Sequence, residues 1–192
     1  MVQSVFGVDD LFYDKNNSGI WSQASISKRM DNYNAMLTAG SRMLASVNAI
    51  NRWLEKVAGK YNPTLTAYNL AFDNSKCANT QIDLNMFSER FCLWAASVGN
   101  ICKSKAYKQF VIENHLFNAR TAHGNMTYST TAEAVTGFLR GEMTDEPHTA
   151  LEDIIGYELP TLVHILKKCN WRENIQSYDW KKHQVKDNFG AK

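Results

Sequence analysis

The sequence contains little proline, little glycine and few cysteines for its length. Of its 192 residues, 3 are proline, 10 are glycine and 4 are cysteine, while 44% are hydrophobic and 21% are charged. This balance argues against a disordered or low-complexity chain, and a chain of this size can bury one substantial core. No two cysteines form a C-x-x-C pair, and four are too few for a fold held together by disulfide bonds. This predicts reduced thiols in an intracellular protein.

The sequence also lacks a secretory signal and a membrane-spanning run. Its first residues show no basic start followed by an apolar stretch, and no segment approaches the ~20 apolar residues of a transmembrane helix. We therefore expect a cytoplasmic protein without a membrane partner. The net charge of +2 is far from the strongly basic balance that would by itself indicate binding to nucleic acid.

Two kinds of periodicity alternate along the chain. Apolar residues at steps of three and four predict helices, whereas short apolar or alternating runs predict strands. The predicted strands are residues 65–68 and 91–94, with a strand or extended arm at 1–13, and the predicted helices are 43–59, 73–84, 95–102, 104–115 and 129–141. This order predicts an α/β fold.

A last helix is predicted from the motif Thr149-Ala-Leu-Glu152, which matches a capping box. Its apolar pattern continues past Pro160, which cannot donate a backbone hydrogen bond to Gly156 and is expected to kink the helix. We predict one domain over residues 1–168 and a polar peripheral tail over residues 169–192.

Two short stretches place acids at helix starts. In Tyr68-Asn-Leu-Ala-Phe-Asp73 the acid follows a predicted buried strand, at the strand end where open α/β sheets build their sites. In His148-Thr-Ala-Leu-Glu-Asp153 the capping register brings His148 and Asp153 together. A histidine beside a carboxylate could accept a proton from water, and the carboxylate could bind a hard cation.

Simpler interpretations exist for each stretch. Asp73 could cap a helix, and His148 with Asp153 could form an ordinary pair of side chains at a helix entrance. Coincidental motif matches in a soluble α/β protein remain a third possibility, because single short motifs are weakly specific.

Together and in this order, the stretches resemble the second and third motifs of DEDDh-type 3'-5' exonucleases, the family of the epsilon-type proofreading subunits. The resemblance covers residues 40–168 and, more loosely, 1–39. It implies an RNase H-like mixed sheet flanked by helices and two divalent ions, Mg or Mn. It also implies Asp73 and Asp153 as metal ligands and His148 as general base. Tyr68, Asn69 and Phe72 would contact DNA, with RNA as a second possible substrate.

The family's first motif, Asp-x-Glu on the first strand, is absent from these 192 residues. The resemblance therefore implies a sheet that lacks its first strands and an activity that needs this segment. An upstream segment or a second polypeptide could supply it. Alternatively, the chain is a catalytically inactive nucleic-acid-binding or replisome-associated subunit.

Overall fold

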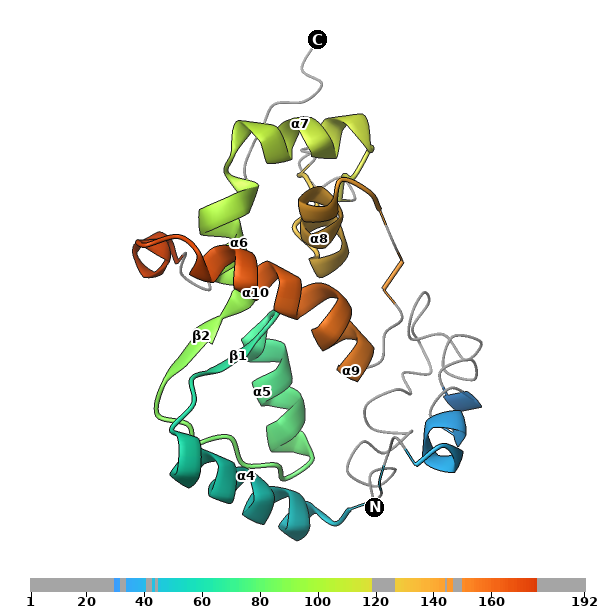
Figure 1. The fold of residues 1–192 in the computed structure, drawn as a ribbon, viewed down its shortest axis with the longest axis vertical. Helices are drawn as coiled ribbons and strands as arrows, with labels where there is room; N and C mark the ends of the chain where they lie inside the picture. Colours follow the sequence, from blue (N-terminus) through green and yellow to red (C-terminus); the bar gives the residue numbers. More distant parts are fainter. Residues whose placement is uncertain are drawn as a thin grey trace. The chain divides into compact units, whose positions relative to one another are not determined.

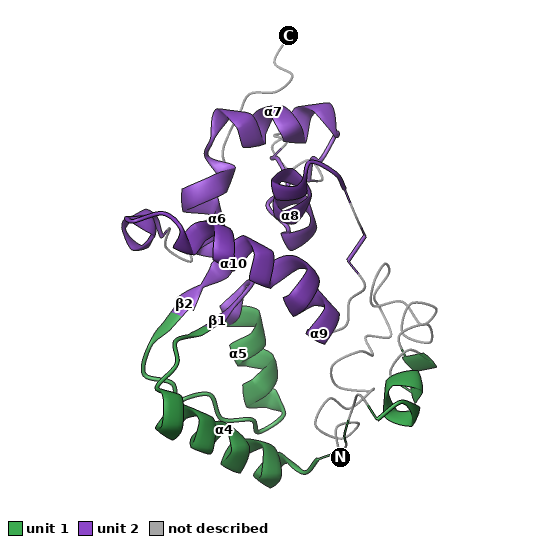
Figure 2. Cartoon of the chain, viewed as in Figure 1, with its two compact units in different colours: residues 1–65, 71–90 green, residues 66–70, 91–192 purple. Residues whose placement is uncertain are grey.

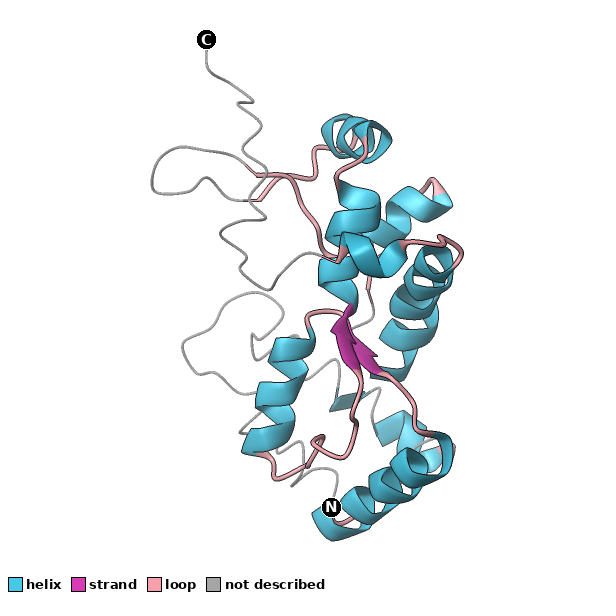
Figure 3. Cartoon of the chain, turned by 90° about the vertical axis from the view of Figure 1, so that its left-hand side faces the viewer, coloured by secondary structure: helices cyan, strands magenta, loops and turns pink. Residues whose placement is uncertain are grey.

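A computed structural model describes residues 30–31, 34–40, 43, 45–118, 127–143, 145–146 and 150–175. The described part is mostly helical and contains a two-stranded parallel sheet, β1 (Leu65–Ala67) with β2 (Arg90–Cys92) (Figures 1 and 3). Helices and a parallel strand pair in alternation agree with the predicted α/β class. Among the described helices, none combines the length and the apolar character needed to cross a bilayer.

The chain divides into two compact units (Figure 2). Unit 1 comprises residues 1–65 and 71–90, and unit 2 comprises residues 66–70 and 91–192. Both strands cross the boundary, since each begins in unit 1 and continues in unit 2.

Unit 1 contains helix α4 (Val47–Tyr61) and most of helix α5 (Leu70–Asn79). Ser46 caps α4 by accepting a hydrogen bond from the backbone N–H of Ala49. Asn51 joins α4 to the segment that follows α5, because its side-chain amide donates to the Gln81 carbonyl at 3.0 Å while its Oδ1 accepts from the Asp83 N–H at 3.0 Å. This pair of bonds fixes which face of α4 turns inward.

Unit 2 contains the main hydrophobic core. Its helices are α6 (Leu93–Ser97), the π-helix η2 (Val98–Cys102), α7 (Lys105–Glu113) and α8 (Ala132–Arg140). The core consists of the buried residues Phe91, Leu93, Ala96, Val98, Ile101, Cys102, Tyr107, Val111, Tyr128, Val135 and Ile165. Because both β2 and α6 contribute to it, the strand and its following helix are fixed to the same apolar cluster.

The segment before α8 is held by hydrogen bonds from three aromatic side chains. Tyr107 Oη donates to the Ser129 carbonyl at 2.8 Å, and Tyr68 Oη donates to the Thr130 carbonyl at 2.5 Å. Trp94 Nε1 donates to the Thr130 hydroxyl at 2.9 Å. Buried aromatic residues with polar tips are stabilised by such partners, so this segment is part of the core rather than a free loop.

The last long helical segment consists of α9 (Ala150–Asp153), the π-helix η3 (Ile154–Glu158) and α10 (Leu159–Leu166). The sequence predicts a kink at Pro160, and the structure has a π-helical turn that ends at Glu158, two residues before the proline. Such turns commonly occur where helices bend. Thr136 of α8 donates to the Tyr157 carbonyl at 3.0 Å and lies 3.2 Å from the Thr161 hydroxyl. These buried hydroxyls tie α8 to the irregular turn.

Several predicted boundaries differ from the structure. Helix α5 starts at Leu70 and ends at Asn79, whereas residues 73–84 were expected, because Asn69 and Gln81 adopt left-handed backbone conformations with φ of 66° and 61°. Strand β2 ends at Cys92, and Leu93 and Trp94 belong to α6. The predicted strand or arm at 1–13 and the capping residue Thr149 lie outside the described residues.

Residues beyond Cys169 include a short 3₁₀-helix, η4 (Trp171–Asn174). The centres of the Trp171 and Phe91 rings are 4.8 Å apart, and Ile175 also packs against the core. Asn100 Nδ2 donates to the Trp171 carbonyl at 3.1 Å. The first part of the predicted tail therefore packs on unit 2, while residues 176–192 lie outside the described part of the chain.

Candidate functional site

Asp73 lies in the first turn of α5, directly after strand β1. The chain leaves the strand through Tyr68 and turns at Asn69, whose φ of 66° is tolerated by asparagine better than by most other residues. The acid therefore lies at the carboxyl end of a parallel strand, as the sequence predicts, where α/β folds commonly hold ligands. A carboxylate in a first helical turn is also stabilised by the helix dipole.

The Asp73 carboxyl group is partly buried. This desolvation raises its pKa above the ordinary value for aspartate, although a backbone hydrogen bond within the residue opposes the shift. One turn further along α5, burial raises the pKa of the Cys77 thiol, and the negative charge of Asp73 raises it further. A partly desolvated carboxylate of this kind gains free energy from a nearby cation.

Asp153, the second predicted acid, ends α9 and lies in unit 2. Its carboxylate belongs to a group of acids contributed by different elements, namely Glu133 of α8, Glu146, and Glu158 of η3. The pKa of Glu146 is raised to about 7. Burial is the largest cause, and the charges of Asp153, Glu133 and Glu158 add to it. The Glu146 N–H also donates to Glu133 Oε1 at 3.0 Å. We refer to these four residues as the acidic group of unit 2.

Sequence reasoning identified only Asp153 within this acidic group. Glu146 stands two residues before His148, but an isolated glutamate carries no periodic or motif signal. Glu133 is a first-turn acid of α8, which is an ordinary helical position. Only the packing of α8 near η3 brings these carboxylates together.

His148, the predicted general base, lies outside the described residues. Within the described residues, no group of three or more His, Cys, Asp or Glu side chains is placed to hold a metal ion. Asp73 and Asp153 nevertheless have the carboxylate oxygens that Mg²⁺ and Mn²⁺ prefer. By donor type both residues fit such an ion, and further ligands would be required to complete its coordination.

The three predicted nucleic-acid contacts have different surroundings. Tyr68 is partly buried, packs against the core of unit 2, and its hydroxyl donates to Thr130. Asn69 is exposed at the turn, and Phe72 exposes 44% of its surface. The Lys76 ammonium lies 5.2 Å from the centre of the Phe72 ring. Of the three residues, Asn69 and Phe72 therefore have side chains accessible to a ligand.

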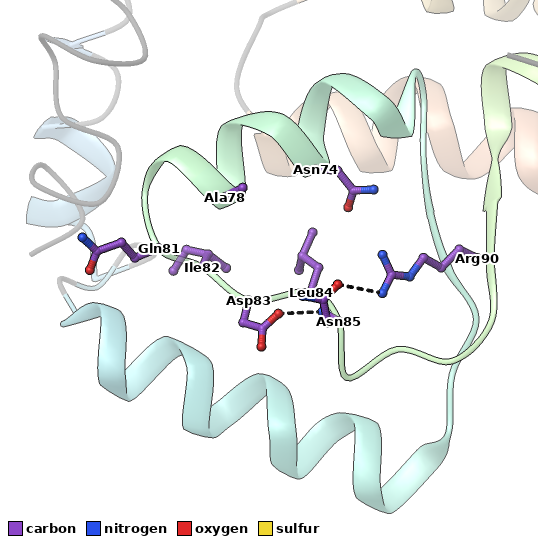
Figure 4. Close-up of a pocket in the computed structure, with 8 residues that line it drawn as sticks. All are labelled: Asn74, Ala78, Gln81, Ile82, Asp83, Leu84, Asn85 and Arg90. Atoms are coloured by element: carbon purple, nitrogen blue, oxygen red, sulfur yellow. Dashed lines mark hydrogen bonds between the residues drawn. The ribbon is translucent and has the colours of Figure 1, made fainter. Parts of the chain in front are cut away.

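Unit 1 also contains a pocket of about 430 Å³ (Figure 4). It is lined by Asn74, Ala78, Gln81, Ile82, Asp83, Leu84, Asn85 and Arg90. Asp83 Oδ1 accepts from the Asn85 N–H at 2.8 Å, and Arg90 Nη2 donates to Asn85 Oδ1 at 3.5 Å, so hydrogen bonds link these three lining residues. Asp73 is not among the lining residues, which makes the pocket and the predicted acid separate features of unit 1.

Comparison of the sequence with protein-family models found no match, and comparisons of the chain with curated proteins and with solved structures found none either.

Proposed function

We propose that this chain is a 3'-5' exonuclease-like protein that removes nucleotides from single-stranded or frayed 3' ends of DNA, with Mg²⁺ or Mn²⁺ as cofactor. The fold would be RNase H-like, with its first strands and the Asp-x-Glu motif supplied by a further segment or a second polypeptide. In the reaction, water attacks the terminal phosphodiester, the bond from phosphorus to the preceding 3' oxygen breaks, and a 5'-mononucleotide leaves.

The observation that carries this proposal is the position of Asp73 at the carboxyl end of β1, in the first turn of α5. A sheet edge of this kind is the usual place for ligands in α/β folds. The Asp73 side chain is partly buried, which raises the pKa of its carboxyl group, and a partly desolvated carboxylate favours a cation partner.

Asp153 supports the same proposal through its surroundings. The pKa of Glu146 is raised to about 7, first by burial and then by the charges of Asp153, Glu133 and Glu158. Concentrated negative charge attracts divalent cations. When bound, such ions would neutralise phosphate charge and activate water. His148 would accept the proton from that water, and Asn69 and Phe72 would position the nucleotide.

A hydrolysis assay on a 5'-labelled single-stranded oligonucleotide tests this function. The chain is assayed alone and together with its upstream coding region or a co-encoded partner, in Mg²⁺ or Mn²⁺. We expect the completed form to shorten the substrate one nucleotide at a time from the 3' end, and a blocked 3' terminus to stop it. The 192-residue chain alone should show little hydrolysis, because the Asp-x-Glu ligands are missing from it.

Asp73→Asn provides the matched variant, since it removes the charge and keeps the shape of the side chain. It should slow hydrolysis by about 100-fold or more, in the range found when one charge-stabilising group is removed from an active site. Absence of hydrolysis in every form, accompanied by retained binding of the oligonucleotide, would favour the inactive nucleic-acid-binding subunit instead.

A further inference from the structure

The outer face of α4 combines regularly spaced cations with an exposed aromatic side chain. Arg52, Lys56 and Lys60 follow each other at steps of four residues, and all three are exposed. Trp53 lies beside them and exposes 62% of its surface. Residues four apart share one face of a helix, at intervals of ~6 Å along its axis. We refer to these four residues as the basic face of α4.

The inner face of the same helix is used by unit 1. Asn51 is bound to the backbone of Gln81 and Asp83, and the aliphatic residues Ile50, Leu54 and Val57 are partly buried. Asn51 and Lys56 are roughly 140° apart around the helix. The basic face is therefore the side that α4 does not use for packing within unit 1.

Positive charge predominates on this face of the helix. Its single acidic residue, Glu55, lies on the flank nearest Arg52, so the cations outnumber the acid. At the helix end, Tyr61 exposes 64% of its surface, and the Lys60 ammonium lies 4.7 Å from the centre of its ring. Large exposed aromatic side chains close to cations are a recurrent feature of interaction surfaces.

We propose that the basic face of α4 binds single-stranded nucleic acid, with Arg52, Lys56 and Lys60 along the phosphates and Trp53 stacked on a base. Cations that follow the backbone, together with aromatic rings for unpaired bases, are the two components of sequence-tolerant single-strand sites. A membrane surface fits less well, because an interfacial helix needs an apolar face for the lipid and the aliphatic face of α4 is turned inward.

This inference goes beyond the proposed function, because it assigns strand binding to a helix that carries none of the predicted catalytic residues. Binding can be measured without hydrolysis, in EDTA, so the two proposals fail separately. The probe is a fluorescein-labelled oligodeoxythymidylate, and the readout is its fluorescence anisotropy with the full chain at several salt concentrations.

Removing the cations should weaken binding and its dependence on salt. Each phosphate contact to a single strand contributes about 0.7 to the slope of log affinity against log salt, so R52Q/K56Q/K60Q should lower the slope by about 2. The matched control K103Q/K105Q/K167Q removes three exposed cations of unit 2 and should leave the slope unchanged. Equal effects of both triple variants would overturn the proposal, since binding would then follow net charge alone.

Removing the Trp53 ring should change the affinity without changing its dependence on salt. Trp53→Ala should weaken binding by roughly tenfold with an unchanged salt slope, whereas Trp53→Phe should retain most of the affinity. Because these side chains are exposed, thermal unfolding of all variants should match the parent chain within a few degrees.

The proposal is overturned if the oligonucleotide does not bind, if duplex binds as tightly as single strand, or if anionic phospholipid vesicles bind in its place.

Discussion

Arg140 donates a hydrogen bond to the carbonyl of Gly156, the group whose i→i+4 helical donor is missing because residue 160 is proline. The two residues are separated by 16 positions in the sequence, so the bond joins the end of α8 to η3. The Arg140 guanidinium also lies 5.5 Å from the centre of the Tyr157 ring. A side chain thus replaces the backbone donor that proline removes.

The contribution of Arg140 can be measured through its coupling to Pro160. Arg140→Ala should lower the free energy of unfolding by about 1 kcal/mol, which is typical for a hydrogen bond from a charged group at an exposed position. Pro160→Ala restores an N–H that can bond to Gly156, so the same arginine substitution should cost less in that background. A double-mutant cycle by urea unfolding measures this coupling, and an arginine effect that is equal in both backgrounds would contradict it.

Glu146 should make stability depend on pH. Its pKa is raised to about 7 by burial and by the neighbouring acids, above the ordinary glutamate value of 4.5. Below the unfolded-state pKa both states are protonated. As pH rises from about 4.5 to about 7 the unfolded state loses its proton first, so stability falls over this window and stays lower above it.

Glu146→Gln removes this titration. The variant should be about as stable as the parent chain at the acid end of the window and more stable by ~1 kcal/mol at pH 8, after allowance for solvent screening of a partly exposed group. Thermal or urea unfolding across this range provides the comparison. A stability difference that does not change with pH would show that Glu146 does not titrate in the predicted window.

Asn69 provides a test of the turn that positions Asp73. Its φ of 66° is costly for a residue with a Cβ atom and free of strain for glycine. Asn69→Ala should therefore destabilise the chain by about 1 kcal/mol, whereas Asn69→Gly should be close to neutral. Equal unfolding free energies of the two variants would mean that the turn rearranges when the side chain is lost.

Some of these features could be predicted from the sequence, because they depend on local pattern. The short apolar run at residues 65–68 indicates β1 and places Asp73 beyond its end, and Pro160 by itself predicts a free carbonyl at Gly156. The donor for that carbonyl could not be predicted, because Arg140 reaches it only through the packing of α8.

Sequence patterns predicted neither the acidic group of unit 2 nor the start of α5, and the reasons are related. Glu133 and Glu146 approach Asp153 through tertiary structure, which leaves no signal at any fixed spacing. The start of α5 depends on the left-handed conformation of Asn69, which asparagine permits but does not require. Sequence patterns therefore identified the candidate acids Asp73 and Asp153. The charged groups around them could be identified only from the structure.

In the proposed exonuclease, Asp73 and Asp153 would serve one hydrolytic reaction, and the rates of Asp73→Asn, Asp153→Asn and the double variant test this proposal. They are measured by 3'-end shortening of the oligonucleotide in the completed form of the protein, with Mg²⁺ or Mn²⁺. If the two acids act as a unit, each single variant should lose about 100-fold or more in rate, and the double variant should be scarcely slower than the slower single variant. Single variants that keep the parent rate, or losses that multiply in the double variant, would show that the two acids do not act together.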